Sequence, residues 1–418
     1  MKNENLVDIA RHVIEHGRAG TMEQADEIFK LPAGVYYDEA RFERDIERIF
    51  RRVPLLLAAS CELPNSGDFK TVQSAGSSVL LTRGKDMTVR GFMNACTHRG
   101  ATLARAETGN RSRFTCPYHG WTFANDGRLI GVAAQQDFGE LDKSAYGLKE
   151  IPVLESAGLV WAVINPESKV DIKGFLCGFD DMLASFGFDR WSYVSTRTFK
   201  GPNWRIAMDG YLEYYHIPVL HGQTFGTNST NRGIYYAWGP HQHIKTPALD
   251  KDHLATEVLG YMAPIADKPE AEWDVETLTF GIWGVFPCAS IACFGGGGRG
   301  VMFSQILPGE SVGESITSQI YLMEKAPEGE DLVAANAQFD FFQQVVMTED
   351  YEMGRSIQRS LPNSGIDHIP LGRNELGNQR FHQWCEKIAA AEDDEALNAL
   401  FAHAGRGLGI PKKAAAGG

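Results

Sequence analysis

The 418-residue sequence lacks several features that would assign it to a well-known class. Its first residues, MKNENLVDIARH, contain no apolar stretch of the kind that a secretory signal requires. No later apolar run approaches the ~20 residues that span a bilayer. Positive charge is not in excess either: the formal net charge is −13, which disfavours nucleic acid and anionic membranes as partners. We therefore expect a cytoplasmic globular protein with neither a nucleic-acid nor a membrane partner.

A nucleotide-binding motif is also missing. Four consecutive glycines, residues 295–298, precede Arg299, but neither G-x-G-x-x-G nor the Walker Lys-Ser/Thr is present. Strand-like runs flank these glycines, which favours a hairpin turn. If NAD(P)H supplies electrons to this chain, another protein must oxidise it.

Cysteine is scarce, but two of the seven cysteines belong to a distinctive pattern. Cys96 and His98 are followed, after seventeen residues, by Cys116 and His119, which gives C-x-H…C-x-x-H. Two thiolates can hold one iron of a [2Fe–2S] cluster while two neutral imidazoles hold the other. Structural zinc also uses Cys₂His₂ sites, but zinc fingers usually take both cysteines from one turn and both histidines from another. The pattern therefore favours a cluster with Cys96, His98, Cys116 and His119 as ligands.

The remaining five cysteines show no motif. They are Cys61, Cys177, Cys288, Cys293 and Cys385. An odd, scattered set in a chain without a predicted signal indicates reduced and mostly buried thiols.

A second candidate metal site lies in the stretch NWRIAMDGYLEYYHIPVLHG. We expect a helix across 203–217, which would put Glu213 and His216 on one face because they are three residues apart. Pro218 should break this helix and free His221 to turn back toward the same metal. Two imidazoles and a carboxylate are typical of mononuclear Fe(II) oxygenase sites. Taken alone, the two histidines could equally be core residues.

Residue periodicity outlines the organisation of the chain. Residues 5–17 and 38–50 have helical spacing, whereas 51–165 consist of short strand-like runs broken by glycine and proline. Mixed structure follows after residue 170, with strand-like runs over 275–325. A long amphipathic helix is expected over 331–361, with a set of apolar side chains largely on one side: Phe339, Phe342, Val346, Met353 and Ile357.

These features together resemble the large (alpha) subunit of the Rieske non-haem iron oxygenases. The likeness is carried by NACTHRGATL, FTCPYHGWTF, Asn203-Trp204 and the acid-x-aromatic-His-x₄-His segment. It implies an α+β fold, with an all-β Rieske [2Fe–2S] domain and a catalytic domain of helix-grip type, an antiparallel β-sheet flanked by helices. We expect four parts: an N-terminal helical segment packing on the catalytic domain (1–50), the Rieske domain (51–168), the catalytic mononuclear iron domain (169–410) and a disordered tail (411–418).

The resemblance also implies roles for particular acids. The family takes its carboxylate ligand from a motif of two acids and a later Gln, which Thr348-Glu349-Asp350…Gln358 matches. Asp350 aligns with the ligand, so the mononuclear iron would be held by His216, His221 and Asp350. Glu349 is the nearest alternative and Glu352 a weaker one.

Glu213 occupies the position of an acid, usually Asp, that bridges subunits in this family. It would link His216 to the partner subunit's His119 in a head-to-tail homotrimer. A carboxylate that accepts an N–H from each imidazole would fix both tautomers and couple both metals. Glu213 is one methylene longer than the usual Asp.

The function implied by the resemblance is that of a terminal oxygenase. It would use O₂ and electrons from a separate ferredoxin or flavin reductase, indirectly from NAD(P)H, for mono- or dioxygenation. An aromatic or other hydrophobic small molecule is the first expectation, because 281–304 is apolar and aromatic. A quaternary amine is the alternative, since Tyr211, Tyr214 and Tyr215 could form a cation–π site. A Rieske electron-transfer protein without oxygenase activity would need the first domain alone.

Overall fold

The computed structural model describes most of the chain. The described residues are 4–19, 21–74, 76–225, 231–245, 266–274, 279, 281–404 and 406–408. The tail predicted to be disordered, 411–418, lies outside them. None of the described helices combines the length and the apolar character needed to span a bilayer.

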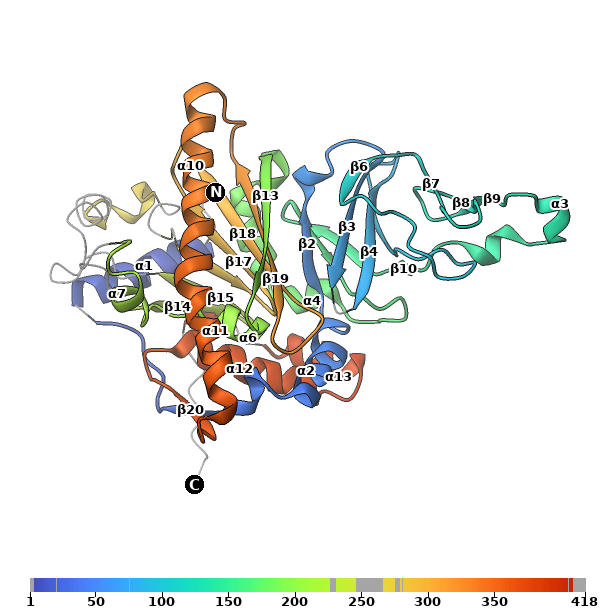
Figure 1. The fold of residues 1–418 in the computed structure, drawn as a ribbon. Helices are drawn as coiled ribbons and strands as arrows, with labels where there is room; N and C mark the ends of the chain where they lie inside the picture. Colours follow the sequence, from blue (N-terminus) through green and yellow to red (C-terminus); the bar gives the residue numbers. More distant parts are fainter. Residues whose placement is uncertain are drawn as a thin grey trace.

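The C-terminal half is built on one antiparallel sheet of eight strands, in the order β13-β19-β18-β17-β16-β15-β14-β21 (Figure 1). The glycine run 295–298 lies in the turn between β17 and β18, where Phe294 pairs with Gly300, so the predicted hairpin is confirmed. The strands are β13 (Ser192–Gly201), β14 (Ile234–Trp238), β15 (His241–Lys245), β16 (Ile282–Val285), β17 (Ala289–Phe294), β18 (Gly300–Pro308), β19 (Ser315–Met323) and β21 (Arg406–Leu408).

A long helical rod lies along one face of this sheet (Figure 1). It consists of α10 (Gly329–Val345), a π-helical turn (Val346–Asp350) and α11 (Tyr351–Ser360). The predicted long helix over 331–361 is therefore confirmed, but the expectation that its apolar side chains lie largely on one side is wrong. A π turn contains an extra residue, so the side chains before and after it face different directions. Phe339 is buried against the sheet, whereas Met353 and Ile357 are 47% and 43% exposed.

The segment that carries the Cys-x-His and Cys-x-x-His motifs is all β, as predicted. It forms three antiparallel sheets, with strand orders β10-β5-β4-β3-β6, β11-β12-β2 and β7-β8-β9. The α+β class is confirmed. The strands are β2 (Leu55–Ala59), β3 (Asp68–Ser74), β4 (Ser77–Arg83), β5 (Val89–Met93), β6 (Thr108–Asn110), β7 (Arg113–Thr115), β8 (Thr122–Ala124), β9 (Leu129–Gly131), β10 (Glu150–Ile151), β11 (Val153–Ser156) and β12 (Leu159–Ala162).

The two halves share one hydrophobic core but differ in shape. A single cluster of buried side chains includes Leu57 and Trp161 of the first half and Trp204 and Phe303 of the second. Gln305 on β18 also donates a hydrogen bond to the carbonyl oxygen of Leu56 on β2 (2.5 Å). Beyond this contact the sheet β7-β8-β9 and helix α3 project as an arm away from the eight-stranded sheet (Figure 1).

The N-terminal segment packs against the C-terminal half. It contains α1 (Glu4–Ala19), β1 (Phe29–Pro32), α2 (Glu39–Asp45) and a π-helical turn (Ile46–Phe50). β1 pairs with β20 (His368–Leu371), which comes from near the end of the chain. The other helices are α3 (Gln135–Phe138), α4 (Ile172–Leu176), α5 (Phe179–Leu183), α6 (Trp204–Asp209), α7 (Ile217–Leu220), α12 (Leu376–Ala390) and α13 (Asp394–Ala402).

A buried ion pair fastens the N-terminal segment to α6. Both oxygens of Asp45 accept hydrogen bonds from the guanidinium of Arg205 at 2.7 Å, and both side chains are 1% exposed. Arg205 also contacts Nδ1 of His382 on α12 (3.3 Å). Trp204, which precedes Arg205 in α6, packs edge-on against Phe50 with ring centroids 4.8 Å apart. The ion pair, the contact with His382 and the packing of Trp204 therefore hold α6 between the N-terminal segment and α12.

This ion pair yields a prediction about stability. Asp45→Ala should lower the free energy of unfolding of the catalytic half by about 3–5 kcal/mol, because it leaves a buried guanidinium without its counter-charge. Denaturant unfolding followed by tryptophan fluorescence measures this change. Glu314→Ala, which removes the partner of the exposed Lys200, is the matched control and should unfold close to wild type. Equal shifts for both variants would contradict the importance of the buried pair.

Candidate metal centres

Two loops of the all-β segment have the same backbone arrangement around their cysteines. In the first loop the N–H of Cys96 donates to the carbonyl oxygen of Ala101 (2.9 Å), and the N–H of Gly100 donates to the carbonyl oxygen of Cys96 (2.7 Å). In the second loop the N–H of Cys116 donates to the carbonyl oxygen of Trp121 (2.7 Å), and the N–H of Gly120 donates to the carbonyl oxygen of Cys116 (3.0 Å). The glycine of each loop has a left-handed φ, +75° and +69°. Glycine adopts this conformation without strain, which lets each loop close over a bound group.

The four motif side chains converge between these loops. The Cys96 and Cys116 thiols are free, buried and close enough to interact with each other. The rings of His98 and His119 lie on the outer side, with centroids 4.7 Å apart. Trp121 stacks on His98 with centroids 4.9 Å apart and limits its rotation. Buried thiols beneath less buried imidazoles fit a cluster with one thiolate-bound and one imidazole-bound iron.

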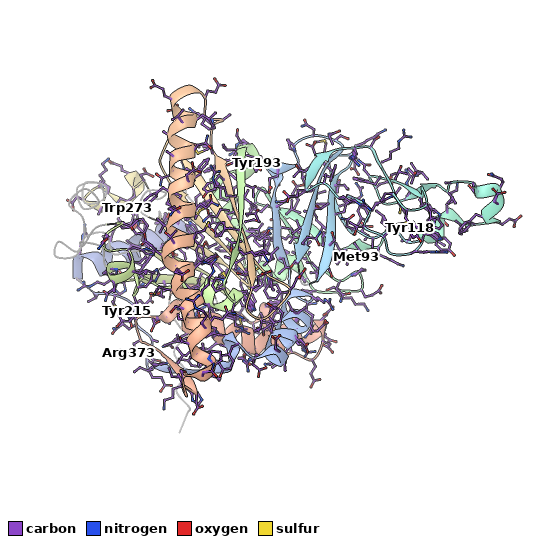
Figure 2. All side chains as sticks on the ribbon, in the orientation of Figure 1. Met93, Tyr118, Tyr193, Tyr215, Trp273 and Arg373 are labelled. Atoms are coloured by element: carbon purple, nitrogen blue, oxygen red, sulfur yellow. The ribbon has the colours of Figure 1, made fainter. Side chains whose placement is uncertain are left out.

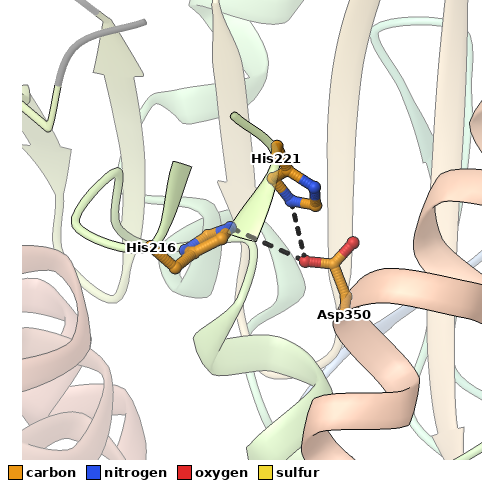
Figure 3. A group of neighbouring side chains, drawn as sticks. All are labelled: His216, His221 and Asp350. Atoms are coloured by element: carbon orange, nitrogen blue, oxygen red, sulfur yellow. Dashed lines mark hydrogen bonds and ion pairs between the residues drawn. The ribbon is translucent and has the colours of Figure 1, made fainter. Parts of the chain in front are cut away.

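The second set of predicted ligands also meets in space. Nε2 of His221 lies 3.2 Å, and Nε2 of His216 3.6 Å, from the same oxygen of Asp350 (Figure 3). One ligand atom from each residue falls within 4.8 Å of the others, and these residues form the one such group of three or more among the described residues. Two imidazoles and a carboxylate on one side of an ion leave its other positions open. The residues present thus fit a mononuclear Fe(II).

The outward nitrogens of both imidazoles are held by glutamates. Nδ1 of His216 contacts Oε1 of Glu213, and Nδ1 of His221 lies 2.7 Å from Oε2 of Glu349. The other oxygen of Glu349 accepts a hydrogen bond from the Thr224 hydroxyl (2.5 Å). A carboxylate on Nδ1 fixes the tautomer in which Nε2 carries the lone pair that binds a metal.

The local backbone differs from the predicted helix across 203–217. α6 ends at Asp209, and Glu213 lies in a turn, so Glu213 and His216 do not share a helix face. The second oxygen of Glu213 accepts hydrogen bonds from the backbone N–H groups of Tyr215 and His216, the latter at 3.1 Å. Side-chain bonds of this kind replace helical ones and stabilise the turn.

Pro218 also acts differently from the prediction. Instead of breaking a helix, it lies in the first turn of the short helix α7, where its missing N–H costs nothing. His216 and His221 are the residues that flank α7. The imidazoles therefore approach the metal position from the two ends of one helical turn.

The π-helical turn supplies the carboxylates. The N–H of Tyr351 bonds to the carbonyl oxygen of Val346, five residues earlier, which defines the wide turn. Glu349 and Asp350 lie within it, and such turns occur often at functional sites. Gly354, one turn further on, lets α11 approach α6: a Cβ there would lie 2.7 Å from Pro202 and 3.0 Å from Ile206.

A cleft of about 410 Å³ opens beside His216. Most of its lining is apolar, but four carboxylates line it as well, and no Lys or Arg occurs among the described residues that do so. The acids are Asp209, Glu213, Asp350 and Glu375. The apolar part includes Ile206, Met353, Ile357, Leu361, Ile366 and Leu371.

Burial and charge shift two pKa values here. Burial raises the pKa of Glu375, and the nearby Glu213 and Asp209 raise it further. Burial alone would lower the pKa of His221, but Asp350 and Glu349 outweigh it, so this pKa is raised. Because metals bind neutral imidazole, protons compete with a metal for His221 at acid pH.

Sequence reasoning missed the roles of Glu349 and Thr224. The family motif makes Glu349 an alternative ligand, yet its side chain reaches the outward side of His221. Thr224 carries no motif and lies three residues after His221, in a segment without predicted structure. Glu375, which lines the cleft, is 162 residues from Glu213 in the chain and carries no sequence signal.

Comparison with protein families gives two matches. Residues 53–152 match the model of the Rieske [2Fe-2S] domain, and residues 188–391 match that of the ring hydroxylating alpha subunit (catalytic domain). The chain therefore belongs to the Rieske non-haem iron oxygenases, as a large (alpha) subunit, and the predicted resemblance is confirmed. The models cover all seven predicted ligands.

Individual relatives agree with this assignment. The glycine betaine monooxygenase oxygenase subunit of Pseudomonas aeruginosa is 31% identical over 210 residues, 50% of this chain and 48% of the relative. The anthranilate 1,2-dioxygenase large subunit of Acinetobacter baylyi is 31% identical over 204 residues, 47% of this chain and 43% of the relative. The chain thus spans about half the length of the curated relatives it matches.

Solved structures share the fold over more of the chain. A quaternary ammonium Rieske monooxygenase in complex with gamma-butyrobetaine aligns with a TM-score of 0.71 at 20% identity, covering 87% of this chain and 96% of that one. Naphthalene 1,2-dioxygenase from Rhodococcus sp. aligns with a TM-score of 0.71 at 22% identity, covering 94% and 99%. At these identities the likeness establishes the fold.

The triad geometry yields a second prediction. His216→Ala, His221→Ala and Asp350→Ala should each lose the mononuclear iron, because two ligands hold Fe(II) poorly, while the visible absorption of the Rieske cluster stays unchanged. Iron analysis of the purified full chain, about three atoms in wild type and about two in each variant, measures the loss. Full iron content in Asp350→Ala would assign the carboxylate ligand to a different acid.

Proposed function

We propose that this protein is the terminal oxygenase of a multicomponent Rieske system. It incorporates oxygen from O₂ into a small molecule, with electrons from a separate ferredoxin or flavin reductase. The observation that carries this proposal is the convergence of His216, His221 and Asp350 in a chain that also has a Rieske domain. An electron carrier would need no such triad. When bound, the cluster relays single electrons and the mononuclear Fe(II) activates O₂.

In this proposal the side chains around the triad bind, orient and exclude water. Glu213 and Glu349 hold the two imidazoles with their Nε2 atoms inward. Tyr351, which follows Asp350, is 1% exposed and its hydroxyl bonds to Thr317 (2.5 Å), so the chain on the sheet side of Asp350 is rigid. The apolar lining of the cleft lowers access of water to His216.

Electron transfer between subunits is part of the proposal. Tyr118 lies on the arm beside His119, whereas Tyr215, beside His216, lies on the other side of the molecule (Figure 2). This separation supports transfer from one subunit to the next in a head-to-tail homotrimer, with Glu213 bridging His216 and the partner subunit's His119.

Glu213 lines the open cleft, and Tyr118, Phe138 and Tyr146 leave apolar surface exposed around the cluster loops. Such surface supports a protein contact at the end of the arm.

Two substrate classes follow from different observations. The apolar run 281–304, on which the expectation of a hydrophobic substrate rested, contributes its large side chains, such as Trp283, Ile291 and Phe303, to the sheet core and none to the cleft. The apolar cleft lining still supports an aromatic or other hydrophobic small molecule. A quaternary amine is the second candidate, because four carboxylates and Tyr36 line the same cleft without any Lys or Arg among its described residues. The tyrosines predicted for a cation–π site do not line this cleft; they are Tyr211, Tyr214 and Tyr215.

A single-turnover experiment tests the function and separates the two classes. The chemically reduced full chain is mixed with O₂ and either anthranilate or naphthalene, or with glycine betaine or carnitine. Members of the accepted class should speed re-oxidation of the Rieske cluster and yield a hydroxylated or demethylated product by mass spectrometry. Re-oxidation without any product from either class would contradict both substrate proposals. An iron content of about two per chain would contradict the oxygenase itself.

Glu213 gives a further prediction. Glu213→Gln keeps the size of the side chain, but its amide presents N–H donors where one of two imidazole N–H groups needs an acceptor. Both metal centres should fill, and the trimer should persist, because the residue is no ligand and contributes little of an interface. Re-oxidation of the reduced cluster with substrate and O₂ should slow by orders of magnitude. Wild-type re-oxidation would show that Glu213 is an ordinary turn residue and would remove the proposed route between subunits.

A further inference from the structure

Two consecutive acids contact opposite sides of one imidazole. Oε2 of Glu349 lies 2.7 Å from Nδ1 of His221, and Oδ1 of Asp350 lies 3.2 Å from Nε2 of the same ring. Glu349 and Asp350 are consecutive residues of the π-helical turn, so their side chains leave it in different directions and can contact the two edges of a ring placed between them. The ring of His221 is 3% exposed, so protein groups surround it on nearly all sides.

The carboxylate of Glu349 is itself fixed. Its Oε1 accepts a hydrogen bond from the Thr224 hydroxyl (2.5 Å), while its Oε2 accepts from His221. Thr224 follows His221 closely, and its backbone N–H bonds to the carbonyl oxygen of His221 (3.0 Å). His221, Thr224 and Glu349 thus form a closed ring of contacts that leaves the carboxylate no freedom to turn toward the metal position.

We propose that Glu349 is a positioning residue that accepts the Nδ1–H of His221 and keeps Nε2 of that ring aimed at the metal position. This inference rests on the proposed function, because it concerns the same mononuclear site. Glu349 does not line the cleft, whereas Glu213, which holds His216, does. The two glutamates therefore differ in role. Glu213 orients His216 and also takes part in the proposed contact between subunits, whereas Glu349 only orients His221. Loss of Glu349 should weaken iron binding without changing transfer in chains that retain iron.

The test compares four variants of the full chain. Glu349→Ala removes the acceptor for Nδ1, Glu349→Gln keeps one acceptor oxygen, and Thr224→Val removes the hydroxyl that holds the carboxylate. Glu352→Gln is the matched control, since Glu352 lies in the same helical region, is 52% exposed and contacts Arg355 and Arg359. Mononuclear iron affinity is measured by competition with a chelator, and its environment by electron paramagnetic resonance of the nitric oxide adduct.

Glu349→Ala should weaken iron binding about 10- to 100-fold and change the resonance of the adduct, because outer partners of a ligand commonly have effects of this size. Glu349→Gln should restore part of the affinity, Thr224→Val should show a smaller loss, and Glu352→Gln should match wild type. The Rieske absorption should stay unchanged in all four.

Three results would overturn the inference. One is wild-type affinity and resonance in Glu349→Ala. Another is a loss in Glu352→Gln as large as that in Glu349→Ala, which would indicate a general effect of charge. The third is loss of iron in Glu349→Ala together with retention in Asp350→Ala, which would make Glu349 the ligand. Failure of the proposed function is distinguishable, because wild type itself would then bind no mononuclear iron.

Discussion

The ion pair between Asp45 and Arg205 determines where the metal-binding segment begins. Two charges with 1% exposure have no water to solvate them, so each requires the other in place. Arg205 also contacts His382, whose Nε2 reaches Asp209 at 2.9 Å, and Asp209 is the last residue of α6. α6 is therefore held near its start by Asp45 of the N-terminal segment and at its end by His382 of α12, although both lie far from the metal ligands in the chain. Residues 210–221, which carry Glu213 and both histidine ligands, follow directly after the end of α6.

A second constraint acts at the ligands themselves. An imidazole can present either nitrogen to a metal, and a carboxylate on one nitrogen decides which. In this chain Glu213 contacts Nδ1 of His216 and Glu349 contacts Nδ1 of His221, which leaves Nε2 of each ring for the metal. Because both glutamates take Nδ1, both Nε2 atoms face Asp350, and the three ligand atoms converge.

The sequence predicts features that depend on local spacing better than those that depend on distant contacts. The four cluster ligands lie in two short loops whose glycines permit the required turn, so their convergence follows from neighbouring residues. Asp350 is 129 residues from His221, and family resemblance alone singled it out among several acids of one helix. The predicted helix over 203–217 failed because the Glu213 carboxylate binds the backbone N–H groups of Tyr215 and His216, an interaction that apolar periodicity does not reveal. The domain boundaries stay a prediction.

The π-helical turn constrains the number of residues between the two packed parts of the rod, α10 and α11. A turn of this kind is an α-helical turn with one residue inserted, and each residue rotates the following side chains by about 100°. Before the turn Phe339 packs into the sheet, and after it Tyr351 and Gly354 are buried against β13 and α6. Deleting one residue between 346 and 350 would restore a regular helix, but only one of these two packed faces could then keep its place. The segment can accept substitutions far more readily than a change of length, and sequences that retain the acids should also retain the number of residues between Phe339 and Gly354.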